Sequence, residues 1–117
     1  LFFGEVNQSA KWFFEKSGVW VDCTHFVENT ERVHFLKSQD LSSLPTYDFV
    51  VFANDFALFG RGNEDETLKN LLTDGGRAIF ISTTEPLSGN IKSVLKSFSF
   101  DVETDGEVKV LSCVKND

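Results

Sequence analysis

Several short segments of the chain are apolar at every position, which is the pattern of strands buried on both faces of a sheet. The clearest are residues 49–53 and 78–81, and shorter runs occupy residues 1–3, 19–21 and, interrupted only by His34, 33–36. Strands of this kind need a layer of helices on each face, so the chain is expected to form a parallel α/β sheet.

Amphipathic segments between these runs predict the helices. In the first of them, Ala10, Phe13 and Phe14 share one face of a helix. Asn7 stands at its N-cap position, and Gly18 fits a left-handed stop. Only about ten residues separate the second apolar run from the third, so any helix between them has one or two turns.

Two more helices are expected in the second half of the chain. Asn63 precedes three acidic residues, which the helix dipole favours in a first turn, and Glu66 can complete a capping box with Asn63. The buried faces of the two helices are Leu68, Leu71 and Leu72 in one, and Ile91, Val94, Leu95 and Phe98 in the other.

The last segment has the pattern of an antiparallel hairpin. Apolar and polar residues alternate over 100–103 and over 107–110, on either side of Asp105-Gly106. An Asp-Gly pair between alternating runs is a strong signal for a two-residue hairpin turn. The expected fold class is therefore α/β: a mostly parallel twisted sheet with helices on both faces and a C-terminal antiparallel hairpin.

Length and charge limit the possible functions. The chain has 117 residues, which suits a single domain over 1–117. Eighteen acidic and eleven basic residues give a formal net charge of −7, which repels nucleic-acid backbones and anionic membrane surfaces. No apolar run approaches the roughly 20 residues of a membrane-spanning helix. We expect a domain that binds neither nucleic acid nor membranes.

The cysteines and the start of the chain give two further expectations. Cys23 and Cys113 lack CxxC spacing, which is typical of buried thiols in a reducing compartment, so the expected location is cytoplasmic. The chain has no methionine and starts inside an apolar run, so we interpret it as a domain excised from a longer chain. Its expected partner is another domain of the same chain or a separate protein.

Aromatic residues are frequent, with thirteen phenylalanines. Most lie on predicted buried faces and are expected in the core: Phe13, Phe14, Phe35, Phe49, Phe52, Phe80, Phe98 and Phe100, with Trp20. Trp12, Phe56 and Phe59 fall off those faces. Exposed aromatic residues of this kind are suited to docking against another domain.

Few side chains suggest chemistry. Asn54 and Asp55 follow the apolar run at 49–53, and open parallel sheets bind ligands at the carboxyl ends of their strands. This pair can orient a substrate or cap the following loop. Cys23, His25 and His34 lack the regular pair spacing of zinc sites, so no metal site is expected.

Taken in order, the segments resemble the S-adenosylmethionine-dependent methyltransferases of the Rossmann-like class. Residues 47–55, an aromatic-aspartate pair followed by apolar residues and a polar end, resemble the fourth strand of that family. Residues 71–81, with two leucines, two glycines, a basic residue and an apolar run, resemble the entry to its fifth strand. The hairpin at 98–114 resembles its reversed last strand.

The resemblance implies four cofactor positions. Gly4 and Glu5 fall in the turn after the first strand. Asp22 matches the acid that holds the ribose hydroxyls, and Asp40 matches the acid that reaches the adenine amino group. An aspartate at a strand end also commonly forms a turn or caps a helix, so a purely structural role is the alternative for both acids.

The turn after the first strand departs from the family. It has one glycine, Gly4, in the six residues 4–9, where the family has two or three. Glycines let the backbone come close to the cofactor, so Val6 and Asn7 are expected to fill part of that space. No cofactor is expected for this domain; S-adenosylmethionine is expected if the domain is active.

Three functions are compatible with this resemblance. The first is a vestigial methyltransferase-like domain with an accessory, docking or regulatory role in a larger protein, as in the nematode phosphoethanolamine N-methyltransferases of phosphocholine synthesis. The second is an active S-adenosylmethionine-dependent methyltransferase without its substrate-binding segments, in which Asn54 or Asp55 orients the acceptor. The third is the N-terminal domain of an anamorsin-like iron-sulfur assembly factor.

Overall fold

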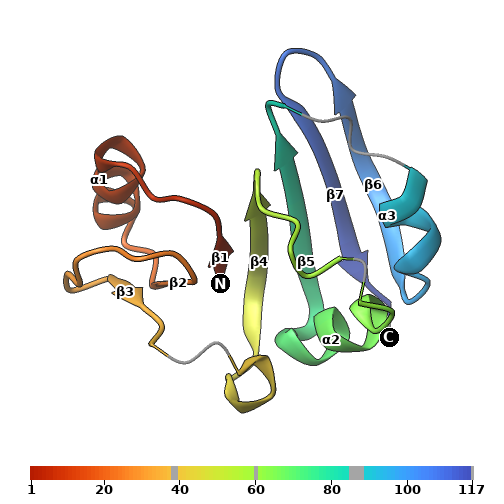
Figure 1. The fold of residues 1–117 in the computed structure, drawn as a ribbon, viewed down its shortest axis with the longest axis horizontal. Helices are drawn as coiled ribbons and strands as arrows, with labels where there is room; N and C mark the ends of the chain where they lie inside the picture. Colours follow the sequence, from red (N-terminus) through yellow and green to blue (C-terminus); the bar gives the residue numbers. More distant parts are fainter. Residues whose placement is uncertain (38–39, 60, 85–88, 117) are drawn as a thin grey trace.

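The computed structural model describes residues 1–37, 40–59, 61–84 and 89–116 (Figure 1). The elements in chain order are β1 (Phe2–Phe3), α1 (Gln8–Ser17), β2 (Val21–Cys23), β3 (Val33–Phe35), the short 3-10 helix η1 (Leu41–Ser43), β4 (Tyr47–Ala53), α2 (Glu64–Leu71), β5 (Leu72–Ser82), α3 (Gly89–Val94), β6 (Phe98–Asp105) and β7 (Lys109–Lys115).

The strands form one sheet in the order β3-β2-β1-β4-β5-β7-β6. Strands β1 to β5 pair in parallel, whereas β7 is antiparallel to both β5 and β6. The predicted fold class is therefore confirmed: the sheet is Rossmann-like and mostly parallel, and it ends in an antiparallel hairpin. The register places Phe2 of β1 beside Cys23 on one side and Val51 on the other.

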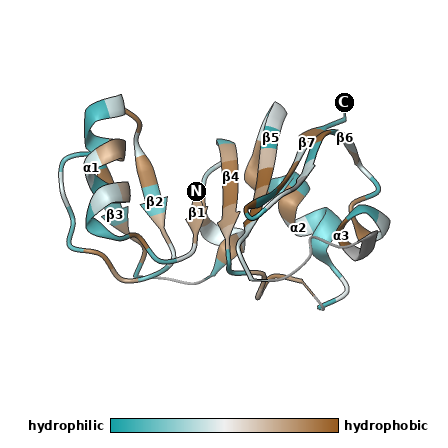
Figure 2. Ribbon diagram, turned by 90° about the horizontal axis from the view of Figure 1, so that it is seen from above, coloured by the Kyte–Doolittle hydropathy of each residue, from teal (hydrophilic) through white to brown (hydrophobic). Residues whose placement is uncertain are grey.

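Helices cover opposite faces of the two halves of the sheet, as the view from above shows (Figure 2). Successive residues of a strand point to opposite faces, and Phe2 and Phe3 belong to two different apolar clusters. Phe2 packs with the α1 side chain Phe14, on the face that α1 covers over β1 to β3. Phe3 packs on the face that α2 and α3 cover.

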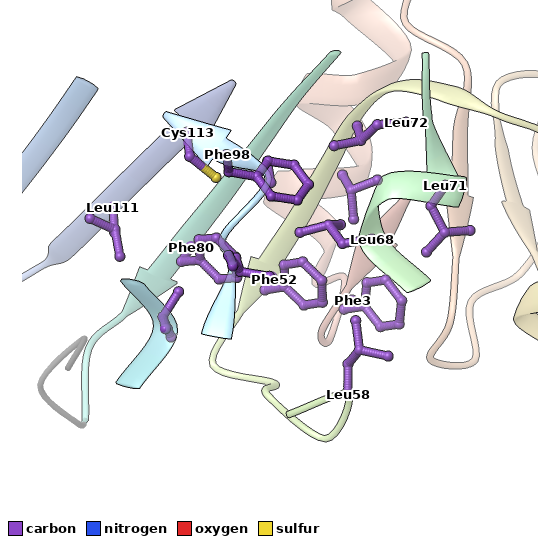
Figure 3. Close-up of a cluster of buried hydrophobic side chains, with 14 of the residues drawn as sticks. Phe3, Phe52, Leu58, Leu68, Leu71, Leu72, Phe80, Phe98, Leu111 and Cys113 are labelled. Atoms are coloured by element: carbon purple, nitrogen blue, oxygen red, sulfur yellow. The ribbon is translucent and has the colours of Figure 1, made fainter. Parts of the chain in front are cut away.

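The larger cluster is centred on three stacked phenylalanine rings (Figure 3). Phe52 of β4 stacks on Phe3 of β1 at 4.6 Å between ring centroids and on Phe80 of β5 at 5.0 Å. Leu68 of α2 and Leu95, which follows α3, bury their side chains in the same cluster. This packing fixes the centre of the sheet to its helical layer.

Helix α1 begins and ends as predicted. The Oδ1 atom of Asn7 accepts a hydrogen bond from the Ala10 N–H at 2.8 Å, and Gly18 closes the helix with φ of 74°. The predicted burial of Phe13 is wrong, since 62% of this residue is exposed. The helix approaches the sheet through Phe14, while Phe13 lies beside Trp12 on its outer surface.

The predictions for four further aromatic residues are wrong. Trp20 and Phe49 are 62% and 55% exposed. Trp20 precedes β2 and packs on His34 at the edge of the sheet. Phe49 lies on the same face of the sheet as α1, but α1 covers the neighbouring strands and does not extend over β4 (Figure 2). Conversely, Phe59 is half-buried because its ring packs against Phe52 and Phe80. Phe56 is half-buried against the same cluster.

Two local turns differ from the sequence predictions. Asn63 makes no side-chain capping bond, and the buried Glu64, rather than Glu66, accepts a hydrogen bond from the Gly62 N–H at 2.8 Å. In the hairpin, Asp105 pairs with Lys109, so the connection has three residues instead of two. Residues 24–32, all described, contain no helix between β2 and β3.

The cysteines are buried, as expected. Cys23 and Cys113 are free thiols with no exposed surface. Burial raises the pKa of Cys23 to about 11 and that of Cys113 to about 12, so both remain protonated at neutral pH. Within the described ranges, no helix is both long and apolar enough to cross a membrane.

Candidate functional site

The candidate site lies where the carboxyl ends of the parallel strands meet. The chain moves outward from β1 through β2 to β3 on one side and through β4 to β5 on the other. The strand order therefore reverses between β1 and β4, and open α/β sheets bind ligands outside the strand ends at such a point. Four segments meet here: Gly4 after β1, Thr24-His25 after β2, Asn54-Asp55 after β4 and Thr83 after β5.

Gly4 brings the turn after β1 against the end of β4. Its φ is 142°, and a Cβ atom at this position would lie 2.5 Å from the carbonyl oxygen of Ala53. Only glycine combines this backbone conformation with so close an approach. The predicted turn glycine thus has a packing role between β1 and β4.

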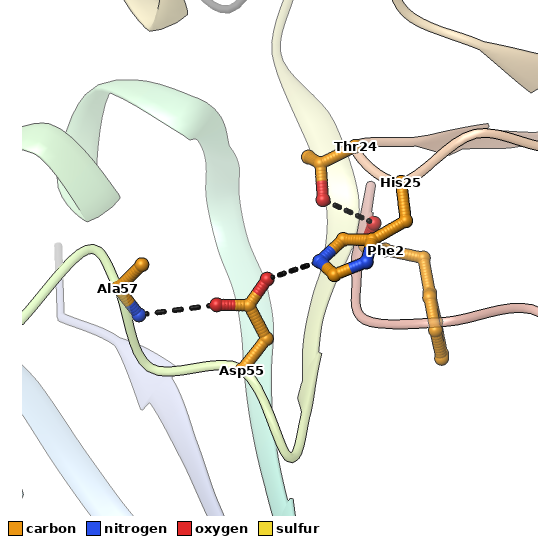
Figure 4. A network of polar contacts seen from close by, with 5 residues as sticks. All are labelled: Phe2, Thr24, His25, Asp55 and Ala57. Carbon is orange, nitrogen blue, oxygen red and sulfur yellow. Dashed lines mark hydrogen bonds and ion pairs between the residues drawn. The ribbon is translucent and has the colours of Figure 1, made fainter.

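A histidine-aspartate pair crosses the end of β1 (Figure 4). His25 Nε2 lies 2.7 Å from Asp55 Oδ2, within hydrogen-bonding distance. Asp55 Oδ1 also accepts from the Ala57 N–H at 3.1 Å, and the Thr24 hydroxyl lies 3.4 Å from the Phe2 carbonyl oxygen, to which it donates. Because β1 lies between β2 and β4, the pair joins the loops on either side of the point where the strand order reverses.

Asn54 joins the loops after β4 and β5. Its φ is 55°, in the left-handed region, where asparagine is enriched among non-glycine residues. Its side-chain amide donates to Thr83 Oγ1 at 3.0 Å, and the Thr83 N–H donates to Asn54 Oδ1 at 2.9 Å. Both polar ends of the amide are thereby used, and Asn54 holds the two loops together.

The two acids assigned to the cofactor by resemblance lie apart from this pair. Asp22 is the central residue of β2, and its Oδ2 atom accepts a hydrogen bond from the Tyr47 hydroxyl at 2.6 Å, at the start of β4. Asp40 caps η1, where its Oδ1 atom accepts from the Ser42 N–H at 3.1 Å and from the Ser42 hydroxyl at 2.6 Å.

Val6 and Asn7, which were expected to fill the cofactor space at the turn after β1, have other positions in the structure. Val6 is half-buried in the cluster on the α1 face, and Asn7 caps α1. Glu5 is exposed. The side chains that span the strand ends are instead His25 and Asp55, from the neighbouring loops.

Two adjoining cavities lie at this edge. One of about 170 Å³ is lined by Thr24, His25, Asp55 and Arg61, among others. A second of about 300 Å³ shares Arg61 with the first and extends to Asp40. The site therefore has small hollows lined by both apolar and polar residues, with side chains of both charges.

These contacts do not fit an S-adenosylmethionine site. Pockets for small-molecule ligands measure about 300–1,000 Å³. The cavity over the end of β1 is smaller, at about 170 Å³, and the space at this edge reaches the lower part of that range only together with the adjoining cavity of about 300 Å³. The acid expected at the ribose, Asp22, is hydrogen-bonded to Tyr47 away from the strand ends, and Asp40 is used within its own turn.

Asp55 was identified from the sequence, but its partner was not. His25 follows the end of β2 by two residues, and Asp55 follows the end of β4 by two residues. This equal spacing is a signal that places both side chains at the same edge once the strands are known to be parallel. Arg61 and Thr83 also contribute to the site without any signal in the sequence. Among the described residues, no group of three or more potential ligands is placed to hold a metal ion.

Comparisons with known proteins identify the fold. Neither the scan against protein-family models nor the search of curated proteins found a match. Among solved structures, a Sulfolobus solfataricus protein assigned as a type 11 methyltransferase is similar over 100% of this chain and 84% of its own, with TM-score 0.72 and 17% identity. The 1,6-didemethyltoxoflavin-N1-methyltransferase of Burkholderia thailandensis, solved with bound S-adenosylhomocysteine, is similar over 99% of this chain and 70% of its own, with TM-score 0.67 and 14% identity.

A Listeria monocytogenes protein assigned as an S-adenosylmethionine-dependent methyltransferase is similar over 99% of this chain and 91% of its own, with TM-score 0.65 and 9% identity. The similarity at these low identities concerns the fold. The chain thus has the fold of the Rossmann-like S-adenosylmethionine-dependent methyltransferases.

The contact between Asp22 and Tyr47 leads to a spectroscopic prediction. Burial, with the hydrogen bond to Asp22, raises the pKa of Tyr47 above its usual value of about 10. Since the folded pKa is the higher one, the stability that Tyr47 contributes is complete below about pH 10 and decreases as the pH rises further. Tyr47 is the sole tyrosine, so phenolate absorbance reports it alone. We expect Tyr47 to ionise at a higher pH in the folded chain than in the chain unfolded in urea. In the folded Asp22→Ala variant it should ionise at a lower pH than in the folded unmodified chain. Equal ionisation of Tyr47 in the variant and in the unmodified chain would contradict the contact.

Proposed function

We propose that this chain is a vestigial methyltransferase-like domain that does not bind S-adenosylmethionine and that acts as an accessory, docking or regulatory domain of a larger protein. The observation that carries the proposal is the His25-Asp55 pair, 2.7 Å apart across the end of β1. A nucleoside cofactor at the reversal of strand order would require the space that this pair spans.

Two more contacts support the proposal. The close approach of Gly4 to the Ala53 carbonyl leaves no backbone gap between β1 and β4. Asn54, the expected acceptor-orienting residue, is bonded at both ends of its amide to Thr83. Asn54 and Asp55, the two residues expected to orient an acceptor, are thus both engaged with the protein itself.

The proposed parent is a phosphobase N-methyltransferase of phosphocholine synthesis in the cytoplasm. The support for this finer assignment is the precedent of those enzymes, in which a reduced methyltransferase-like domain accompanies a catalytic one. The partner on this proposal is the other domain of the same chain or a separate protein.

A thermal-unfolding measurement with S-adenosylhomocysteine tests the proposal. A ligand at 100 times its dissociation constant stabilises a folded protein by about 2.7 kcal/mol. We expect no change in the melting temperature at millimolar S-adenosylhomocysteine, with the toxoflavin methyltransferase as the positive control. A clear, saturable increase would overturn the proposal in favour of an active methyltransferase domain.

A further inference from the structure

One side of helix α2 presents polar side chains to a cavity. Asn63, at the N-cap position, Thr67 and Asn70 have the spacing i, i+4 and i+7, which places them on one side of a helix. Together with Leu41 and Ser42 of η1, which α2 contacts, they line the cavity of about 300 Å³ described above. Its volume is at the lower end of the range of about 300–1,000 Å³ that is usual for small-molecule sites.

The polar groups of this cavity are available to a ligand. Four polar side chains of its lining form no hydrogen bond or ion pair with the part of the chain that the structure describes: Arg61, Asn63, Thr67 and Asn70. The guanidinium of Arg61 is a fork of donors that fits a carboxylate at two points. Amide and hydroxyl groups both donate and accept, so the other three side chains suit the hydroxyl groups of a ligand.

The acidic side chains at this edge are engaged with the protein, unlike Arg61. Asp40, in the same lining, accepts hydrogen bonds from the N–H and the hydroxyl of Ser42. Asp55, in the adjoining cavity, lies within hydrogen-bonding distance of His25 and accepts from the Ala57 N–H. The Asp40 carboxylate still adds a negative charge to the cavity wall, which opposes a doubly charged anion more strongly than a singly charged one. The balance of charges therefore favours an anion with one charge.

The cavity also has an apolar part. Leu41 of η1 and Leu58 after β4 line both this cavity and the adjoining one of about 170 Å³. Leu58 is buried and Leu41 is half-buried against the main cluster. Apolar side chains in this position suit the C–H face of a hydroxylated ring, because contact removes apolar surface from water.

We propose that the cavity between α2 and η1 binds a small hydroxylated monocarboxylate of the sugar-acid type. Arg61 would pair with the carboxylate, and the polar side chains of α2 would bind the hydroxyl groups. This proposal does not depend on the proposed function, because the lining of the cavity includes neither His25 nor Asp55.

D-Glucuronate and D-glucuronamide test the proposal, since they share a ring with its hydroxyl groups and differ in charge. NMR titrations of each into the full chain, at about pH 7.5 and roughly physiological salt, are followed at the backbone amides of Asn63, Thr67 and Asn70. Glucuronate is expected to bind about tenfold more tightly than the amide. Equal affinities of the two ligands, or no saturable binding of glucuronate, would overturn the proposal.

Glucose 6-phosphate tests the assignment to a monocarboxylate. Its phosphate carries nearly two negative charges at about pH 7.5, so it is expected to bind more weakly than glucuronate. Tighter binding of glucose 6-phosphate than of glucuronate would contradict the assignment.

Two variants locate the effect. Arg61→Gln is expected to reduce glucuronate affinity about tenfold, with little change for the amide. Lys69→Gln is the matched control, because it removes one positive charge from α2 at a residue outside the cavity lining, and its effect is expected to be less than about twofold. An equal loss in both variants would mean unspecific attraction to basic side chains and would contradict the assignment. The comparison of acid and amide on the unmodified chain remains decisive if Arg61→Gln fails to fold.

Discussion

Replacing Phe52 with alanine is expected to lower the free energy of unfolding by about 3–5 kcal/mol, the range for deleting a fully buried phenylalanine. Phe52 has no exposed surface and is the middle ring of the stack formed with Phe3 and Phe80. Because these rings belong to β1, β4 and β5, the resulting cavity would lie at the centre of the sheet. Urea denaturation of the two chains measures the difference.

Phe26→Ala is the matched control for the loss of one phenylalanine ring. Phe26 is 75% exposed and touches Phe35 at the surface, so its replacement is expected to cost less than about 1 kcal/mol. Similar losses in the two variants would contradict the stacked core described above.

Gly4→Ala is expected to destabilise the fold by about 2–5 kcal/mol, which combines the costs of backbone strain and of overpacking. The φ of 142° disfavours any residue with a Cβ atom, and that atom would meet the Ala53 carbonyl at 2.5 Å. The contact is with backbone at the end of β4, which cannot move away as a flexible side chain would. Thermal or urea unfolding of the variant tests this.

Gly18→Ala separates the two causes. Gly18 also has a positive φ, 74°, but a Cβ atom there would have no neighbour within 4 Å. This control is expected to lose only the cost of the left-handed conformation, about 1 kcal/mol. If Gly4→Ala costs no more than Gly18→Ala, the turn after β1 does not press against β4.

The sequence was sufficient for the order of the elements. Strands buried on both faces are apolar without alternation, so the runs at residues 49–53 and 78–81 predict the centre of a parallel sheet, and they lie in β4 and β5. The caps of α1 were predictable as well, because the capping roles of Asn7 and Gly18 involve only residues within one turn of the helix ends. Properties that depend on neighbours in sequence were therefore predictable.

Burial at single positions was harder to predict. An apolar pattern shows which residues share a face but not whether a second layer covers that face. Phe49 has the pattern of a core residue, yet its face of β4 lies beyond α1 and is exposed. Phe59 lies in a loop without periodicity and is nevertheless packed on Phe52 and Phe80.

The candidate site was predicted in part for the same reason. The positions of Asp55 and Gly4 after strand ends follow from local patterns. The pairing of Asp55 with His25 requires the strand order, because it arises only when β1 lies between β2 and β4. The partner of Asp22, Tyr47, is 25 residues away in the chain and is likewise set by the order of the strands.

The most direct test of the central claim is an NMR titration of the full chain with S-adenosylhomocysteine, followed at the backbone amides of Gly4, Thr24 and Asn54. These residues surround the end of β1, where the His25-Asp55 pair lies. If the pair closes this edge, the three amide signals remain unchanged at millimolar ligand. Saturable shifts of these signals would show that the cofactor binds at this edge and would contradict the account.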